Sequence, residues 1–113
     1  LVESVAMNSN VAIGVFIQKW KLLETLTIEL LIKHKLLSDN LSKREKLHSY
    51  KHRVSLIENK FISATYFNKI QDLNKVRNVI VHEREQYFTE IEIKEFSREL
   101  DKILEILSEK ISE

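Results

Sequence analysis

Apolar side chains recur every three or four residues along most of this chain, which is the spacing of one face of an α-helix. The first such segment runs from the polar residues at 8–10 to about Lys35, and residues 1–8 are expected to form a tail or an extra turn. Gly14 lies inside this segment, where it either bends the helix or allows close packing. The apolar positions that recur in it are Phe16, Trp20, Leu23, Leu26, Leu30 and Leu31.

A second helix is predicted after the polar loop at 38–40. Ser42 and Glu45 have the spacing of a capping box, in which each side chain binds a free backbone amide of the first helical turn. A heptad pattern predicts the buried stripe of this helix, which consists of Leu47, Tyr50, Val54, Ile57 and Phe61.

Two further amphipathic segments complete the chain. The third follows the break at 63–65 and has the apolar positions Tyr66, Ile70, Leu73, Val76, Ile80 and Val81. The fourth begins at a second capping-box pair, Thr89 and Glu92, and its apolar positions are Ile93, Phe96, Leu100, Ile103, Leu107 and Ile111. Four amphipathic helices with short loops predict a single all-α domain over residues 1–113, arranged as an up-down-up-down four-helix bundle. The aromatic side chains assigned to packing are Phe16, Trp20, Tyr50, Phe61, Phe67 and Phe96.

Composition narrows the classes of function. With 113 residues, one Gly and no Pro, the chain lacks the turn residues of an all-β fold and the glycines of a phosphate-binding loop. The absence of Cys excludes disulfides, thiol nucleophiles and Cys-built zinc sites. His48 and His52 share a helix face with Glu45, but a di-iron bundle needs a second Glu-x-x-His, so we assign these residues to the surface and expect no metal and no cofactor.

The chain offers no apolar run long enough to span a bilayer, and its first residues lack the features of a signal peptide. We therefore expect a cytoplasmic protein that does not bind membranes.

The net charge of +1 conceals an uneven distribution of charge. Residues 1–82 carry an excess of six basic side chains, whereas residues 83–113 carry an excess of five acidic ones. Basic side chains on one helix attract phosphate backbones regardless of sequence, so the basic residues of the second segment are candidates for RNA binding. The alternative interpretation is an ordinary solvated helix face. These candidates are Lys43, Arg44, Lys46, Lys51 and Arg53.

Arg77 is the residue that does not fit a plain bundle. At about 100° per residue it projects between Leu73 and Ile70, in the middle of the apolar stripe of the third segment. A guanidinium is rarely buried without a partner. Either the side chain reaches solvent, or a carboxylate such as Glu83 or Glu85 neutralises it, or this part of the stripe lines a cleft.

Asn78 and His82 lie four residues apart and therefore side by side on the helix. A guanidinium grips phosphate oxygens with two parallel hydrogen bonds, an imidazole transfers protons near neutral pH, and an amide orients either group. This set of residues suits phosphodiester transfer in RNA. Arg77 and His82 nevertheless project about 140° apart, so one helix does not aim both at the same point.

The stretch from Leu73 to Glu83, LNKVRNVIVHE, resembles the signature of HEPN domains, written R-x(4–6)-H with a polar residue after the Arg. The family is an all-α bundle that carries this motif near the end of a late helix. The resemblance implies a metal-independent endoribonuclease that leaves a 2′,3′-cyclic phosphate and a 5′-hydroxyl. It also implies a homodimer that brings both copies of the motif together at its interface. Arg77 and His82 could then act at one point although they project in different directions from a single helix.

In the roles that the resemblance implies, His82 is the acid/base, Arg77 contacts the phosphate and Asn78 orients its neighbours. Such domains occur in bacterial toxin–antitoxin, phage-defence and RNA-processing systems, which implies RNA and an antitoxin or other protein as partners. One subfamily of toxins carries a tyrosine two residues after the His. This chain has Arg84 there, and its nearest tyrosine is Tyr87.

Two alternatives from other classes stay open at the level of sequence. The first is a HEPN-like dimer that binds a protein or nucleic acid without cutting it. The second is a helical interaction domain with a structural role, in which an internal carboxylate pairs with Arg77.

Overall fold

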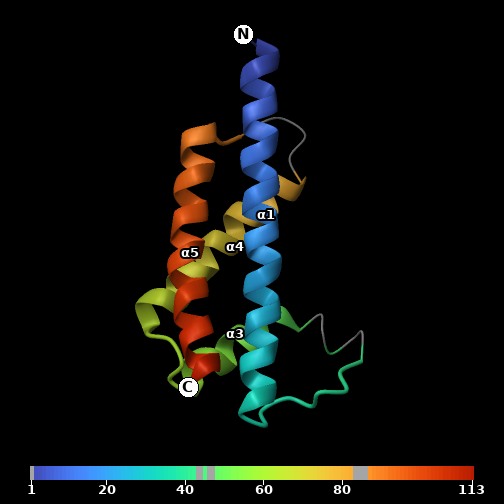
Figure 1. Cartoon of the computed structure of the whole chain (residues 1–113), viewed down its shortest axis with the longest axis vertical. Helices are drawn as coiled ribbons and strands as arrows, with labels where there is room; N and C mark the ends of the chain where they lie inside the picture. Colours follow the sequence, from blue (N-terminus) through green and yellow to red (C-terminus); the bar gives the residue numbers. More distant parts are fainter. Residues whose placement is uncertain (1, 43–44, 46–47, 83–86) are drawn as a thin grey trace.

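The computed structural model of the chain describes residues 2–42, 45, 48–82 and 87–113, and within these ranges it describes side chains from Asn10 onward. This part of the chain folds into four α-helices and contains no strand. They are α1 (Val2–Lys33), α3 (Ser49–Glu58), α4 (Ala64–His82) and α5 (Glu90–Ser112) (Figure 1). The all-α four-helix bundle predicted from the sequence is confirmed.

The 32-residue helix α1 sets the length of the molecule. At 1.5 Å per residue it spans about 48 Å, close to the longest dimension of 51 Å. The radius of gyration of 15.3 Å exceeds the ~13 Å typical of a compact domain of this size. The helix begins at Val2, so residues 2–8 extend α1 and project beyond the start of α5 (Figure 1).

Helices α1 and α5 pack side by side and run in the same direction. Their contacts keep a constant offset along the chain: Lys19 pairs with Asp101 at 2.9 Å, and the rings of Phe16 and Phe96 lie 6.5 Å apart. Near the far end, Lys33 Nζ donates to the backbone oxygen of Glu113 at 3.0 Å. An antiparallel pair would instead show a constant sum of residue numbers.

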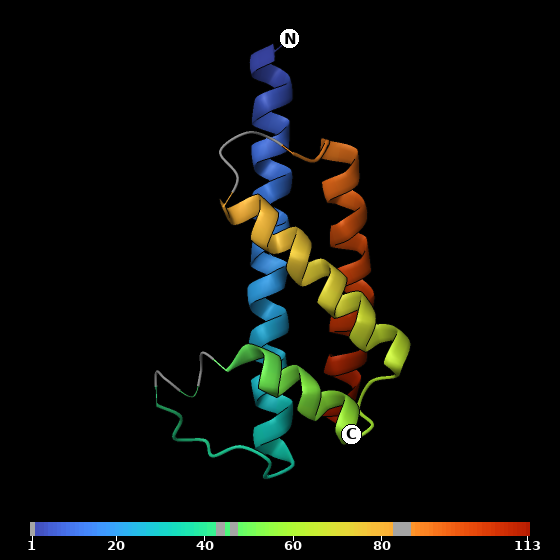
Figure 2. The same ribbon diagram turned by 180° about the vertical axis from the view of Figure 1, so that it is seen from behind.

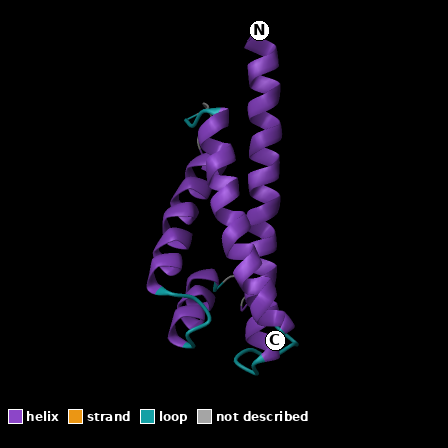
Figure 3. Cartoon of the chain, turned by 60° about the vertical axis from the view of Figure 1, so that its left-hand side comes forward, coloured by secondary structure: helices purple, strands orange, loops and turns teal. Residues whose placement is uncertain are grey.

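The short helix α3 explains this parallel pairing. It has ten residues and lies across one end of the bundle, so it does not carry the chain back along the long axis (Figure 2). Helix α4 makes the return, and α5 then follows the direction of α1. The bundle therefore departs from a simple up-down-up-down alternation. Helices α3 and α4 lie together on one side of the α1–α5 pair (Figure 3).

The core is built mainly from α1 and α5, as their periodicity predicted. Leu23, Leu30 and Leu31 of α1 face Leu100, Ile103 and Leu107 of α5 in one cluster of buried side chains. Ile70 and Leu73 of α4 and Leu56 of α3 cover this cluster from the other side. Phe16, Trp20 and Ile93 are also buried, while Leu26, Phe61, Phe67, Val76, Ile80, Phe96 and Ile111 are half-buried around them.

The helix ends are fixed by hydrogen bonds of two kinds. At α5, Thr89 Oγ1 accepts from the Glu92 amide and the Glu92 side chain accepts from the Thr89 amide, so the predicted capping box is confirmed. Ser42 and Glu45 make the same reciprocal bonds.

Helices α1 and α3 both end in a Schellman motif, the hydrogen-bonded turn in which one residue adopts the left-handed conformation. After α1 that residue is Lys35, with φ of 61°, and the Leu36 amide donates to Leu31. After α3 it is Lys60, with φ of 59°, and the Phe61 amide donates to Leu56. Lysine thus occupies the position that usually belongs to glycine.

The heptad stripe predicted for the second helix is wrong at Tyr50, whereas Ile57 and Phe61 of that stripe are half-buried and pack against the core. Tyr50 is 60% exposed, and the buried residues of α3 are His52, Arg53 and Leu56. The apolar pattern misleads at Tyr50 because Gln71 of α4 accepts a hydrogen bond from Arg53 and so stabilises a polar side chain on the buried side of α3. Leu47, the first residue of that stripe, lies outside the described residues.

Gly14 is exposed, and a Cβ built there would meet no atom within 4 Å. Close packing is therefore not the reason for this glycine. Among the described residues, no helix combines the length and the hydropathy that a bilayer crossing requires.

Candidate functional site

The Arg77–Asn78–His82 motif occupies the C-terminal half of α4, and His82 is the last residue of that helix. Arg77 is half-buried, and its Nη1 donates to the Asn78 side-chain oxygen at 3.0 Å. Asn78 and His82 are exposed. Of the three arrangements that the sequence left open for Arg77, the structure shows the first. The side chain reaches the surface of the bundle, where the Asn78 amide oxygen accepts a hydrogen bond from it.

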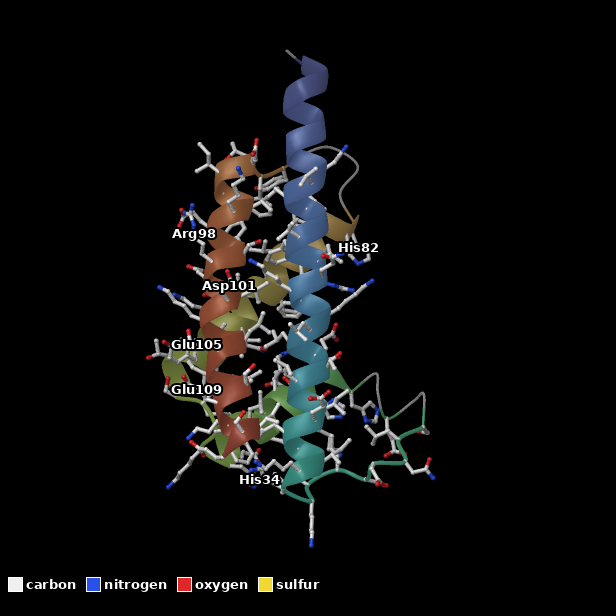
Figure 4. The ribbon with its side chains drawn as sticks, in the orientation of Figure 1. His34, His82, Arg98, Asp101, Glu105 and Glu109 are labelled. Carbon is white, nitrogen blue, oxygen red and sulfur yellow. The ribbon has the colours of Figure 1, made fainter. Side chains whose placement is uncertain are left out.

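No carboxylate within the described ranges forms an ion pair with Arg77. The nearby acids that could neutralise it, Glu83 and Glu85, lie outside those ranges. Figure 4 shows that His82 lies on the opposite side of α1 from Asp101 and Glu105 of α5. These two acidic side chains of α5 therefore lie on a different part of the surface from the motif.

One copy of the chain brings together only two of the three motif side chains. Arg77 and Asn78 are joined by their hydrogen bond, but no hydrogen bond links either of them to His82 in the part of the chain that the structure describes. This agrees with their divergent projection on one helix. One copy presents a guanidinium with an amide and, one turn further along, an imidazole.

The basic residues predicted to contact RNA do not form one exposed face. Lys51 is exposed, whereas Arg53 is only 7% exposed and turned toward α1 and α4. The assignment of Arg53 to a solvated surface is wrong, because its guanidinium packs in the interior and its Nε donates to Gln71 at 2.8 Å. Lys43, Arg44 and Lys46 lie outside the described residues.

His52 requires the same correction. The surface assignment is correct for His48, which is exposed. It is wrong for His52, which is buried with 5% of its surface exposed. Burial lowers the pKa of His52, and the neighbouring His48, Lys51 and Arg53 lower it further. The folded protein therefore favours a neutral imidazole at this position.

A second polar cluster thus lies between α1 and α3, on a side of α3 that the heptad pattern did not assign to the core. Glu24 of α1 accepts a hydrogen bond from Ser49 of α3 at 3.1 Å. Burial lowers the pKa of Arg53, while Glu24 and Tyr50 act in the opposite direction. A cavity of about 20 Å³ separates the two helices here, lined by Trp20, Leu23, Glu24, Thr27, Ile28, Ser49, His52 and Arg53.

Periodicity could not find this cluster, because its members are polar and come from two distant segments. One signal was present in the sequence, namely Glu24 inside the densest apolar stretch of the chain. An acid in such a stretch calls for a polar partner from another helix. Among the described side chains, no group of three His, Asp or Glu is placed to hold a metal ion.

Comparison with known proteins adds no relative to this picture. No family model matches the chain, and no match was found among curated proteins or solved structures.

Proposed function

We propose that the chain is a HEPN-like endoribonuclease that cuts RNA by attack of a 2′-hydroxyl on the adjacent phosphodiester. The observation that supports this most directly is the state of Arg77: it stands at the surface of a late helix, bound to Asn78. A guanidinium held by an amide oxygen keeps its charge available for a phosphate, whereas one paired with a carboxylate does not.

The proposed roles follow from the chemistry of each group. His82, exposed in the last turn of α4, removes the proton of the 2′-hydroxyl. The 2′-oxygen bonds to phosphorus, the 5′-oxygen leaves, and a second imidazole returns a proton to it. Arg77 stabilises the negative charge that develops on the phosphate oxygens, and Asn78 fixes the guanidinium plane. The products are a 2′,3′-cyclic phosphate and a 5′-hydroxyl.

Two copies of the chain are part of this proposal. The mechanism uses one imidazole as base and another as acid, and each copy supplies only one His82. A dimer in which two α4 ends face each other brings two guanidinium and two imidazole groups to one phosphate. It also removes the geometric difficulty that Arg77 and His82 diverge on a single helix.

Mixing an inactive variant with the wild type tests the composite site. We expect Arg77→Ala and His82→Ala each to lose cleavage while keeping the helical circular dichroism of the wild type. In excess over the wild type and under conditions that exchange subunits, His82→Ala should lower the activity below that of the equally diluted wild type, because each heterodimer holds only one of the two imidazoles that the mechanism uses. Two active homodimeric variants, or unfolding of Arg77→Ala, would contradict the assigned roles.

A second candidate function rests on a different surface. Val11 and Val15 of α1 are 67% and 40% exposed, and Leu22 continues the same helix face at 45%. An exposed apolar stripe of this kind is typical of a surface that binds another protein. It favours a HEPN-like binding module that acts without cleavage, and partner binding by a folded wild type that cuts no RNA would distinguish this function from a nuclease.

A further inference from the structure

The cavity between α1 and α3 holds buried cationic groups that the proposed nuclease does not use. Arg53 and His52 are consecutive residues of α3, only 7% and 5% exposed, and both line the cavity. A buried guanidinium is strongly disfavoured unless an acceptor or an anion compensates its charge.

Arg53 makes one hydrogen bond out of the five that its guanidinium offers. Its Nε donates to Gln71, but its terminal nitrogens donate to no acceptor within the described part of the chain. His52 makes no side-chain hydrogen bond there either. No fully shielded side-chain nitrogen or oxygen in that part lacks a partner, so these free groups reach the cavity rather than being sealed among apolar atoms.

The carboxylate already present does not neutralise Arg53 by contact. Glu24 lines the same cavity. It accepts a hydrogen bond from Ser49, and it forms no ion pair with Arg53 within 4 Å. The neighbouring His48, Lys51 and Arg53 each oppose protonation of His52 and lower its pKa.

We propose that this cavity is an oxyanion site, in which the terminal N–H groups of Arg53 and the imidazole of His52 hold oxygens of a phosphate group. Two parallel N–H groups match two phosphate oxygens. A phosphate suits the site better than a carboxylate, since the exposed Lys51 lies close enough to act on the charge of His52 and can balance a second negative charge.

The size of the cavity decides how the group enters. About 20 Å³ exceeds the roughly 10–15 Å³ that one water needs, so the cavity admits an oxygen rather than a whole phosphate. Glu24, Ile28 and Ser49 are only half-buried, so this part of the lining reaches solvent. The phosphate places one oxygen inside while its remaining atoms stay at the mouth. Free phosphate and the backbone of RNA share this chemistry.

Binding at this site is linked to pH. An anion beside His52 favours the charged imidazole, so binding raises the lowered pKa of His52 and becomes tighter as the pH falls toward that pKa. The charged groups that face His52 are Glu24 from α1 and His48, Lys51 and Arg53 from α3, while α4 contributes the neutral Gln71.

The test follows the imidazole signals by NMR in the His82→Ala chain, which removes the proposed nuclease site from the experiment. Inorganic phosphate is compared with sodium chloride at equal ionic strength. We expect phosphate to raise the pKa of His52 while leaving that of the exposed His34 unchanged. Equal effects of phosphate and chloride, or equal shifts of His52 and His34, would overturn the proposal.

A second arm separates the two sources of phosphate. A short single-stranded RNA without terminal phosphates shifts His52 only if the site accepts a phosphodiester. A response to inorganic phosphate alone assigns the site to free phosphate, a response to RNA alone assigns it to the backbone, and a response to neither overturns it.

Variants of Arg53 give the final check. Arg53→Gln should abolish the phosphate response, whereas Lys102→Gln on the exposed side of α5 should leave it unchanged. If Arg53→Gln does not fold, Arg53→Lys keeps the charge without the paired N–H groups, and we expect it to bind phosphate about tenfold more weakly. A full response in a folded Arg53 variant would contradict the proposed site.

Discussion

Burial of His52 on the inner side of α3 couples one imidazole to the stability of the fold. Burial and three neighbouring cations lower its pKa in the folded protein, whereas in the unfolded chain it titrates at its ordinary value near 6.5. Below that pH the unfolded chain binds more protons than the folded one. The stability that His52 contributes is therefore complete above about pH 6.5 and is lost as the pH falls toward the lowered pKa.

We expect the free energy of unfolding to fall between pH 7.5 and 5.5 by at most about 1.4 kcal/mol per pH unit on account of His52. Urea unfolding in a phosphate-free buffer measures it. His52→Gln should flatten this dependence, whereas His34→Gln, at an exposed position, should retain it. An unchanged pH dependence in a folded His52→Gln would show that the imidazole is not the group responsible.

Lys60 carries local strain, because its φ of 59° lies in the left-handed region that a Cβ disfavours. We expect Lys60→Gly to stabilise the protein by about 1 kcal/mol, since glycine adopts this conformation without the steric cost. Thermal unfolding measures the gain. The same change at Lys75, exposed within α4, should cost about 1 kcal/mol, and equal effects at both sites would refute this explanation.

At the scale of elements, α5 could be predicted from the sequence and α3 could not. The apolar face of α5 and its Thr89–Glu92 capping box both appear in the structure because they depend on residues within one segment. The buried face of α3 depends on Gln71 and Glu24, which belong to other helices. Apolar periodicity carries no information about such partners, so the heptad pattern placed Tyr50 in the core instead of His52 and Arg53.

Helix α1 should tolerate a better helix former at its single glycine. Gly14 is exposed with nothing near its Cβ position, so alanine adds no clash and restricts the unfolded chain. We expect Gly14→Ala to raise the free energy of unfolding by roughly 0.5–1 kcal/mol. Chemical denaturation checks the gain, and Gly14→Val should give less of it because β-branched residues are poorer in helices. Destabilisation by alanine would mean that the glycine serves an interaction outside the single chain.

At the scale of the molecule, the sequence predicted how many helices form but not how they run. Periodicity shows which face of a helix is buried, not which helix covers it. The parallel pairing of α1 and α5 follows from the transverse α3, whose ten residues are too few to reverse the chain along the bundle. The Arg77–Asn78–His82 motif lies on a late helix, as the sequence predicted. The periodicity of one chain carries no information about where a second copy of the chain would bind.

The central claim is that the end of α4 cuts RNA, and product analysis of a mixed RNA pool in EDTA tests it most directly. We expect the wild type and His34→Ala to produce fragments with 2′,3′-cyclic phosphate and 5′-hydroxyl ends, and His82→Ala to produce none. Cleavage that survives His82→Ala, or fragments with 3′-hydroxyl ends, would contradict the proposed mechanism. No cleavage by the folded wild type would contradict the nuclease assignment and favour the binding module.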